Sequence, residues 1–229
     1  MDGSESMTEL DFDKQKDFVT RVAESFHMTP TMTQFALITY SSSANLHIRF
    51  KDHMNQSAFS TIVRQLPFAA GGTRFDKAIK LAAENVFTEE SGARPGVPKV
   101  MIILTDGQQS QDYDALPLQQ AVLPLHRLSV QVHAVAIGNQ VKMAELRKLV
   151  QKEEDIFSIK DFDNLVDKSR QLARKTCDII TRPPQGNYGC YGLKKNAKTL
   201  YLFLLSNFPS RYRQFSGHCL VKISLIKSM

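Results

Sequence analysis

Short apolar runs recur along most of this chain and predict buried β-strands. The clearest are Gln34–Tyr40 (QFALITY), Val100–Leu104 (VMIIL), Val130–Ile137 and Ile156–Ile159. Each is four to eight residues long and is bounded by polar or turn-forming residues, as is typical of strands covered on both faces. A fifth strand is predicted where Leu46, Ile48 and Phe50 alternate with polar residues, so that residues 41–45 connect a hairpin with a half-exposed edge strand.

Between these runs, apolar residues recur at helical spacing. The stripes that predict amphipathic helices lie at Phe18–Phe26, Phe59–Leu66, Ile79–Val86, Leu118–Leu128, Lys142–Val150 and Phe162–Ala173. Strands that alternate with helices favour a parallel sheet with helices on both faces. We therefore predict a doubly wound α/β domain over residues 1–181, with a mostly parallel sheet and one antiparallel edge strand.

The last part of the chain, residues 182–229, differs from the rest. It starts with the helix-breaking Arg182-Pro183-Pro184 and contains eight Lys and Arg but no Asp or Glu. Apolar clusters at Leu200–Leu205 and Leu220–Leu225 are compatible with strands. Because sustained periodicity is absent, we expect a basic, poorly ordered tail.

Charge and composition exclude some functions. The formal net charge of the 229 residues is +6, but residues 1–181 hold 21 basic and 23 acidic side chains, so a nucleic-acid-binding face is not supported there. The apolar run at Leu200–Leu205 is too short to cross a membrane, and from Met1-Asp2-Gly3 we expect no signal peptide in this sequence. The three cysteines, Cys177, Cys190 and Cys219, lack zinc-site spacing and leave the redox compartment undecided.

Three oxygen-rich stretches are candidates for a metal site. Asp2-Gly3-Ser4-Glu5-Ser6 offers a carboxylate and two hydroxyls at alternate positions, which suits Mg²⁺ or Mn²⁺. Thr73 follows two glycines before a predicted helix, and Asp106 follows a predicted buried strand. Ligands of open parallel sheets bind at the carboxyl ends of the strands. Taken singly, each stretch is also compatible with an ordinary turn or helix cap.

In combination these stretches resemble the von Willebrand factor type A family. The matching segments are Asp2-Gly3-Ser4-Glu5-Ser6, Gly71-Gly72-Thr73, Ile103-Leu104-Thr105-Asp106-Gly107, Gly92-Ala93-Arg94-Pro95 with Pro98-Lys99-Val100, and the Asp161-Phe162 helix that ends in Cys177. Integrin inserted domains belong to this family. Because Ile137 to Val141 passes directly to the next helix without the extra helix of collagen-binding integrins, the chain is more similar to matrix proteins such as matrilins and collagen VI.

The resemblance implies a metal-ion-dependent adhesion site. Its ligands would be Asp2, Ser4, Ser6, Thr73 and Asp106, holding Mg²⁺ or Mn²⁺ with one coordination position open. An Asp or Glu from a protein ligand, in the extracellular matrix or on a cell surface, would complete the coordination. The resemblance also implies that the last helix, Phe162 to Cys177, corresponds to the helix that changes position in integrin relatives.

The sequence departs from the family pattern in two places. Family members begin with a buried central strand that leads into the Asp-Ser loop, whereas Met1 alone precedes Asp2 here. We therefore expect a domain that lacks its first strand. Extracellular members often pair the cysteine after the last helix with one before the first strand, and Cys177 has no such partner.

Other functions are compatible with the same residues. An enzyme is not favoured, because the chain has no G-x-S-x-G elbow and no phosphate-binding loop, although a metal-dependent phosphotransferase stays conceivable. An intracellular scaffold of the same family or a truncated, non-functional form are further alternatives. Asn55-Gln56-Ser57 is a glycosylation sequon that would be used after secretion, or a helix cap.

Overall fold

The computed structural model describes residues 8–69, 71–138, 141–165, 168–181 and 222–228. They form a six-stranded sheet in the order β2-β1-β6-β3-β4-β5. The strands are β1 (Gln34–Tyr40), β2 (Ala44–Ile48), β3 (Lys99–Thr105), β4 (Val130–Ile137), β5 (Ile156–Ile159) and β6 (Lys222–Ser228). β2 pairs antiparallel with β1 at one edge, and the remaining neighbours pair in parallel. The predicted doubly wound sheet with one antiparallel edge strand is confirmed.

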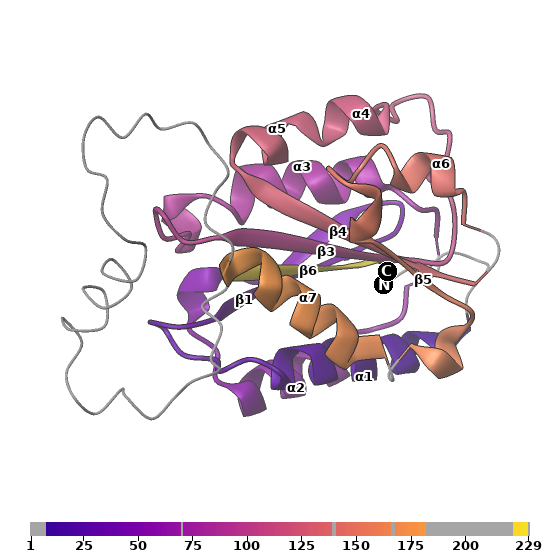
Figure 1. Ribbon diagram of the computed structural model, residues 1–229. Helices are drawn as coiled ribbons and strands as arrows, with labels where there is room; N and C mark the ends of the chain where they lie inside the picture. The colour runs from indigo at the N-terminus through magenta and orange to yellow at the C-terminus, as the bar shows by residue number, and fades with distance from the viewer. Residues whose placement is uncertain (1–7, 70, 139–140, 166–167, 182–221, 229) are drawn as a thin grey trace, which may run out of the picture.

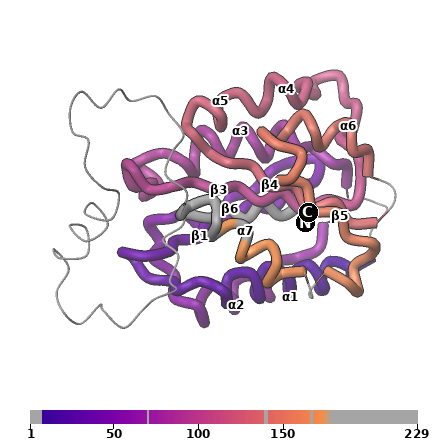
Figure 2. The backbone as a smooth tube through the Cα atoms, in the orientation of Figure 1, coloured from indigo at the N-terminus to yellow at the C-terminus, as the bar shows by residue number. Residues whose placement is uncertain are grey.

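Helices cover both faces of the sheet, as Figure 1 shows. The α-helices are α1 (Glu9–Glu24), α2 (Gln56–Gln65), α3 (Phe75–Asn85), α4 (Leu118–Ala121), α5 (Leu123–Arg127), α6 (Met143–Leu146) and α7 (Ser169–Thr181). Short 3₁₀ turns are η1 (Phe50–Asp52), η2 (Glu89–Ser91), η3 (Glu153–Asp155) and η4 (Phe162–Asn164). The tube view shows α1, α2 and α7 below the sheet and α3 to α6 above it (Figure 2). The domain therefore has three layers.

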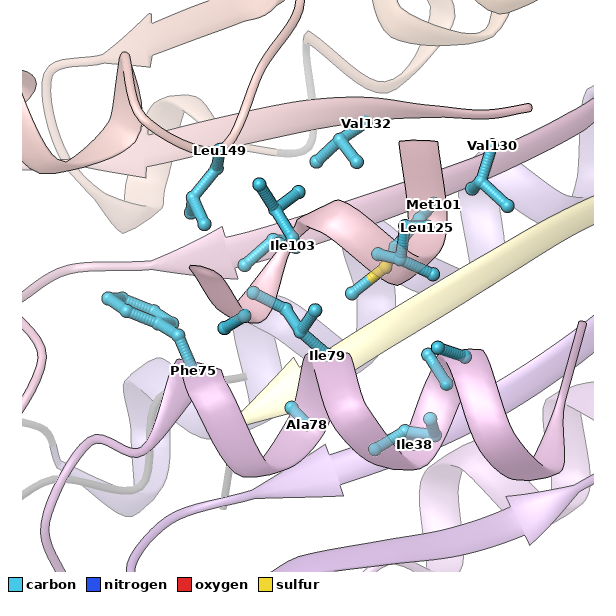
Figure 3. Close-up of a cluster of buried hydrophobic side chains, with 14 of the residues drawn as sticks. Ile38, Phe75, Ala78, Ile79, Met101, Ile103, Leu125, Val130, Val132 and Leu149 are labelled. Carbon is cyan, nitrogen blue, oxygen red and sulfur yellow. The ribbon is translucent and has the colours of Figure 1, made fainter. Parts of the chain in front are cut away.

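The alternation of side chains along β3 explains why two hydrophobic cores form. Val100, Ile102 and Leu104 belong to the core beneath α1, α2 and α7. Met101 and Ile103 point the other way, into the core beneath α3 and α5, and Figure 3 shows them facing helix α3. A strand that is buried on both faces needs apolar residues at successive positions. This requirement accounts for the continuous run that the sequence shows here.

Several predicted helices differ from the structure. The one at Lys142–Val150 is shorter, since α6 spans Met143–Leu146. The stripe at residues 118–128 divides into α4 and α5, because Pro124 lies in the first turn of α5 and has no N–H to continue the hydrogen bonds of α4. The predicted last helix begins later than expected. Phe162 lies in the 3₁₀ turn η4, which Asp161 caps by accepting a hydrogen bond from the Asn164 N–H, and α7 begins at Ser169.

The structure also differs from the expected division of the chain at residue 181. Residues 222–228, expected in a poorly ordered tail, form β6 in the middle of the sheet. Ile223 is in register with Phe35 of β1 on one side and with Val100 of β3 on the other. β6 therefore occupies the central position of the sheet, between β1 and β3. The cluster at Leu200–Leu205 lies outside the described residues.

Candidate functional site

The candidate site lies at the edge of the sheet where the parallel strands have their carboxyl ends. β3 ends at Thr105, and Asp106 follows directly. The two residues after Gly71, Gly72 and Thr73, lead into α3. Asp2, Ser4 and Ser6 lie outside the described residues. The structure thus places two of the five predicted ligands, Thr73 and Asp106.

The start of α1 lies at this same edge. Thr8 is its N-cap residue, and its Oγ1 accepts a hydrogen bond from the Asp11 N–H in a capping box. Within the first two turns, Phe12 contacts the ring of Phe68, which lies just before the Gly71-Gly72-Thr73 loop. Lys14 pairs at 2.7 Å with Asp163, which follows the end of β5. The chain therefore enters α1 beside the loops that carry the candidate ligands.

The loops that carry Thr73 and Asp106 are joined by two hydrogen bonds, one to a side chain and one between backbone groups. The Thr73 N–H donates to Ser110 Oγ at 2.8 Å, and the Ser110 N–H donates to the Thr73 carbonyl at 2.8 Å. Ser110 follows Asp106 by four residues. Thr73 is buried, and the N-cap residue of α3 is Arg74. The alternative interpretation, that Thr73 is the N-cap of this helix, therefore does not hold.

Two glycines let the backbone approach its neighbours closely at this loop. The Gly72 N–H donates to Ser42 Oγ at 2.9 Å. A Cβ atom at Gly72 would lie 2.8 Å from Ser110 Oγ, and one at Gly71 would lie 3.0 Å from Ser42 Oγ. Both distances are shorter than ordinary contacts of a Cβ atom. A side chain at either position would push against a serine hydroxyl that accepts a hydrogen bond from this loop.

Asp106 occupies a fixed and nearly buried position. The turn after β3 is made by the neighbouring residue, because Thr105 Oγ1 accepts a hydrogen bond of 3.1 Å from the Gly107 N–H. The Asp106 side chain is 9% exposed. Buried carboxylates are normally paired with cations or hydrogen-bond donors. This environment suits a metal ligand better than a solvated turn residue.

A buried arginine network stabilises the same two loops, and sequence reasoning missed it. Arg74, which is 1% exposed, donates from Nε and Nη2 to the two carboxylate oxygens of Asp76 at 2.9 and 2.8 Å. Its Nη1 donates to Asp112 at 3.0 Å and to Asp114 at 2.6 Å. The hydrogen bond to Asp76 raises the pKa of Arg74 above its already high value. In the sequence, a signal for this network is the acidic pair Asp112 and Asp114 in the loop that follows Asp106.

The electrostatics of this network favour ionised carboxylates. Burial alone would raise the pKa of Asp76, but hydrogen bonds from Arg74 and from the Leu116 N–H hold this pKa below its usual value. The hydrogen bond from Arg74 likewise lowers the pKa of Asp114. Charge-assisted, bidentate pairs of this kind are strong and directional. Arg74 therefore fixes the 110–116 segment against the start of α3.

Gln109 extends this bracing to the neighbouring helix. Its Oε1 accepts from the Asp76 N–H at 3.2 Å, and its Nε2 donates to the Leu116 carbonyl at 2.9 Å. Its backbone N–H donates to Glu145 of α6 at 3.0 Å. Beside it lies a pocket of about 210 Å³ lined by residues that include Leu116 and Lys148. Thr73 and Asp106 are not among the lining residues.

The described residues alone do not form a metal site of acidic, histidine or cysteine ligands. Within this part of the chain, no three His, Cys, Asp or Glu side chains come together in a way that could hold a metal ion. Of the five predicted ligands, the described part of the chain supplies one hydroxyl, from Thr73, and one carboxylate, from Asp106. Likewise, none of the helices in the described ranges has the length and apolar character needed to cross a membrane.

Comparison with known proteins gives consistent matches. The sequence model of the von Willebrand factor type A domain matches residues 1–171. Matrilin-1 from Gallus gallus is 31% identical over 179 residues, which is 77% of this chain and 35% of matrilin-1. Integrin alpha-X from Mus musculus is 30% identical over 185 residues, covering 76% of this chain and 15% of the integrin. The chain thus spans about a third or less of the length of these curated relatives.

Among solved structures, proximal thread matrix protein 1 from the mussel byssus matches with a TM-score of 0.70. The match covers 76% of this chain and 45% of the mussel chain, at 21% identity. A second structure of that protein is described as having a zinc-occupied MIDAS motif. At this identity, the likeness bears on the fold alone.

Proposed function

Because this chain belongs to the von Willebrand factor type A family, we propose that it is a metal-dependent module for binding other proteins. The proposed metal is Mg²⁺ or Mn²⁺. The proposed ligands, directly or through water, are Asp2, Ser4, Ser6, Thr73 and Asp106. A protein partner would contribute an Asp or Glu carboxylate to the remaining coordination position. The proposed function is binding, without a catalysed reaction.

The main support for this proposal is that the loops of Thr73 and Asp106 lie together at one edge of the sheet. The paired hydrogen bonds between Thr73 and Ser110 hold the two loops together. The residues supply a hydroxyl and a carboxylate, the hard oxygen ligands that Mg²⁺ and Mn²⁺ prefer. α1 begins at the same edge, and residues 2–6 directly precede α1 and its N-cap Thr8 in the sequence. The available side chains therefore fit such an ion.

The roles of the residues follow from their positions. Asp106 would supply negative charge from a nearly buried place, and Thr73 a neutral hydroxyl. When bound, a divalent cation supplies an electrophilic centre that attracts a carboxylate from outside. Arg74 keeps the loop before α3 and the loop after β3 in place through ion pairs with Asp76, Asp112 and Asp114. Because those carboxylates are already paired with Arg74, we do not assign them as metal ligands.

The relatives support a matrix or cell-surface setting for the partner. The chain is similar to matrilin-1 and to integrin alpha subunits. The structural neighbour from mussel byssus is a thread matrix protein described with zinc in its MIDAS motif. We therefore propose an extracellular location and an acidic protein partner, with neither nucleic acid nor membrane insertion involved.

Metal binding to the purified chain tests this function. At a metal concentration of 100 times Kd, binding stabilises the folded state by about 2.7 kcal/mol, which corresponds to a rise of about 5 to 10 °C in Tm for a domain of this size. We expect Asp106→Asn to lose most of the rise and Thr73→Ala to lose part of it. Asp13→Asn and Thr61→Ala change exposed residues of α1 and α2 and serve as matched controls. An equal rise in Asp106→Asn would count against the site.

A further inference from the structure

β6 differs from the other strands in how it joins the sheet. It pairs in parallel with β1 from Gln34–Lys222 to Ala36–Ser224. On its other side it pairs in parallel with β3 from Lys99–Lys222 to Ile103–Ile226. Residues 182–221 separate it in sequence from α7. β6 is thus a strand distant in sequence that lies between two strands of the main domain.

We propose that the space between β1 and β3 is a binding site for a separable parallel β-strand. Segment 222–228 occupies it as an exchangeable ligand, and the same sequence supplied as a separate peptide binds there in its place. The chemical class of the ligand is a short apolar peptide in extended conformation. This inference goes beyond the proposed metal site and does not depend on it.

A contact outside β6 ties the two walls of this site, β1 and β3, together at its carboxyl end. Tyr40, the last residue of β1, donates from its hydroxyl to the Leu104 carbonyl of β3 at 2.9 Å. This hydrogen bond is buried and reaches from one wall to the other. The last register pair of β6 with β3 is Ile226 with Ile103, one residue before Leu104. The bond therefore bridges the site just beyond the paired length of β6.

A second contact bridges the opposite end. Arg94, five residues before β3, donates from Nη1 to the Thr31 carbonyl at 2.6 Å and from Nη2 to the Met32 carbonyl. Thr31 and Met32 lie just before β1. Like the Tyr40 bond, this contact does not involve β6. The spacing of β1 and β3 is therefore fixed at both ends by the main domain.

Each wall is also supported from its outer side. β3 pairs with β4 from Lys99–Val130 through Thr105–Ala136. β1 pairs with β2 on its far side. Its Phe35 and Leu37 belong to the core beneath α1, and its Ala36 and Ile38 belong to the core beneath α3. A site whose walls are held in this way is preorganised, and preorganisation favours binding because little order must be created.

The ligand would be recognised mainly through its backbone. Buried N–H and C=O groups need partners, and an unpaired one costs about 1 to 3 kcal/mol. Strand addition normally uses one edge of a sheet. Here the walls offer backbone groups on both sides of the incoming strand. A proline in the middle of the ligand should therefore prevent binding, since it lacks the N–H.

The connection through residues 182–221 sets how readily exchange occurs. A ligand that is covalently connected to its site is held there at an effective concentration of the order of millimolar. A free peptide must therefore reach roughly millimolar concentration to replace half of β6 in the intact chain. Cutting the connection removes this advantage. The same peptide should then exchange at concentrations on the order of 100-fold lower.

The test uses the full chain with a specific protease site introduced between residues 182 and 221. The protein is folded, cut and kept in EDTA, so that the outcome is independent of metal binding. The probe is a fluorescent peptide of residues 219–229. We expect the cut fragment to co-elute with the domain, and the probe to gain anisotropy with the cut protein at concentrations that leave the uncut protein unlabelled.

The control peptide carries Ser224→Pro, at the position in register with both Ala36 and Met101. It should not bind, and neither should a scrambled peptide of equal composition. Circular dichroism reports whether the cut domain stays folded. Equal binding of the proline peptide, lack of exchange into a folded cut protein, or unfolding on cutting would each overturn the proposal.

Discussion

The backbone N–H of Thr73 donates a 2.8 Å hydrogen bond to the side-chain oxygen of Ser110. This bond connects the loop before α3 to the loop after β3. Ser110 is not a proposed ligand, but its hydroxyl determines where the Thr73 backbone lies. The geometry of the proposed site therefore depends on a residue that would not contact the metal.

We expect Ser110→Ala to weaken metal binding without abolishing it. Loss of the hydrogen bond should also lower the free energy of unfolding by about 0.5 to 1.5 kcal/mol. Mg²⁺ titration followed by calorimetry measures the first effect, and denaturant unfolding in EDTA measures the second. Ser25→Ala, at an exposed serine at the end of α1, is the matched control. Unchanged Mg²⁺ affinity in Ser110→Ala would contradict the bracing role.

Removal of the Arg74 side chain should destabilise the domain strongly. Arg74→Met leaves Asp76 buried without its ion-pair partner, and breaking a buried pair in this way costs about 3 to 5 kcal/mol. Arg147→Met removes an exposed pair with Glu153 and should cost less than about 1 kcal/mol. Urea unfolding of both variants makes the comparison. A similar loss in both would show that the Arg74 network contributes little.

Acid should weaken the same network in a defined direction. The folded-state pKa of Asp76 is lowered, so its contribution to stability is present above the ordinary Asp pKa of about 3.9 and is lost as pH falls towards the folded value. We expect the free energy of unfolding to fall more steeply below about pH 4 in the natural chain than in Asp76→Asn. Identical slopes for the two proteins would exclude this role for Asp76.

The hydrogen bond from Tyr40 of β1 to Leu104 of β3 can be tested by removing a single oxygen atom. Tyr40→Phe removes the hydroxyl and leaves the buried Leu104 carbonyl without that donor, which should cost about 1 to 3 kcal/mol. In the cut protein it should also lower the affinity for the 219–229 peptide. Tyr113→Phe changes a fully exposed tyrosine and should alter neither quantity. If Tyr40→Phe binds the peptide as tightly as the parent, the bridge does not preorganise the strand site.

A strand fused at the amino end should compete with β6. About seven apolar, β-prone residues placed before Met1 would lead directly into Asp2, as the central strand does in the family. We expect this strand to take the position between β1 and β3, to release residues 222–228, and to raise both stability and Mg²⁺ affinity. Trypsin cleavage after Lys222 should then become faster. Unaltered cleavage and stability would mean that β6 retains its place.

Local patterns were sufficient to predict most of the fold. The runs at Gln34–Tyr40 and Val130–Ile137 coincide with β1 and β4, because strands buried on both faces need continuous apolar residues. The segment of β6 was compatible with a strand at Leu220–Leu225 but was expected in a poorly ordered tail, since Lys222–Ser228 mixes polar with apolar residues. β6 takes the position between β1 and β3. That position depends on the tertiary structure, which a local sequence pattern does not contain.

The candidate site was predicted in part for similar reasons. Thr73 and Asp106 could be selected because their residue types and strand-end positions suit a metal ligand. Ser110, Arg74 and Gln109 could not, because their importance arises from partners about 30 to 40 residues away in sequence, as for Arg74 with Asp112 and Asp114. The ligand assignments of Asp2, Ser4 and Ser6 stay predictions.

We propose that one divalent cation lies between the Thr73 and Asp106 loops and residues 2–6. Crystals grown with MnCl₂ and measured for anomalous scattering would locate the metal directly. We expect one strong peak within about 2.0 to 2.3 Å of oxygens from the Asp106 loop or its bound waters, from Thr73 and from the Asp2–Ser6 segment. A peak elsewhere, or none at an Mn²⁺ concentration that raises Tm, would contradict it.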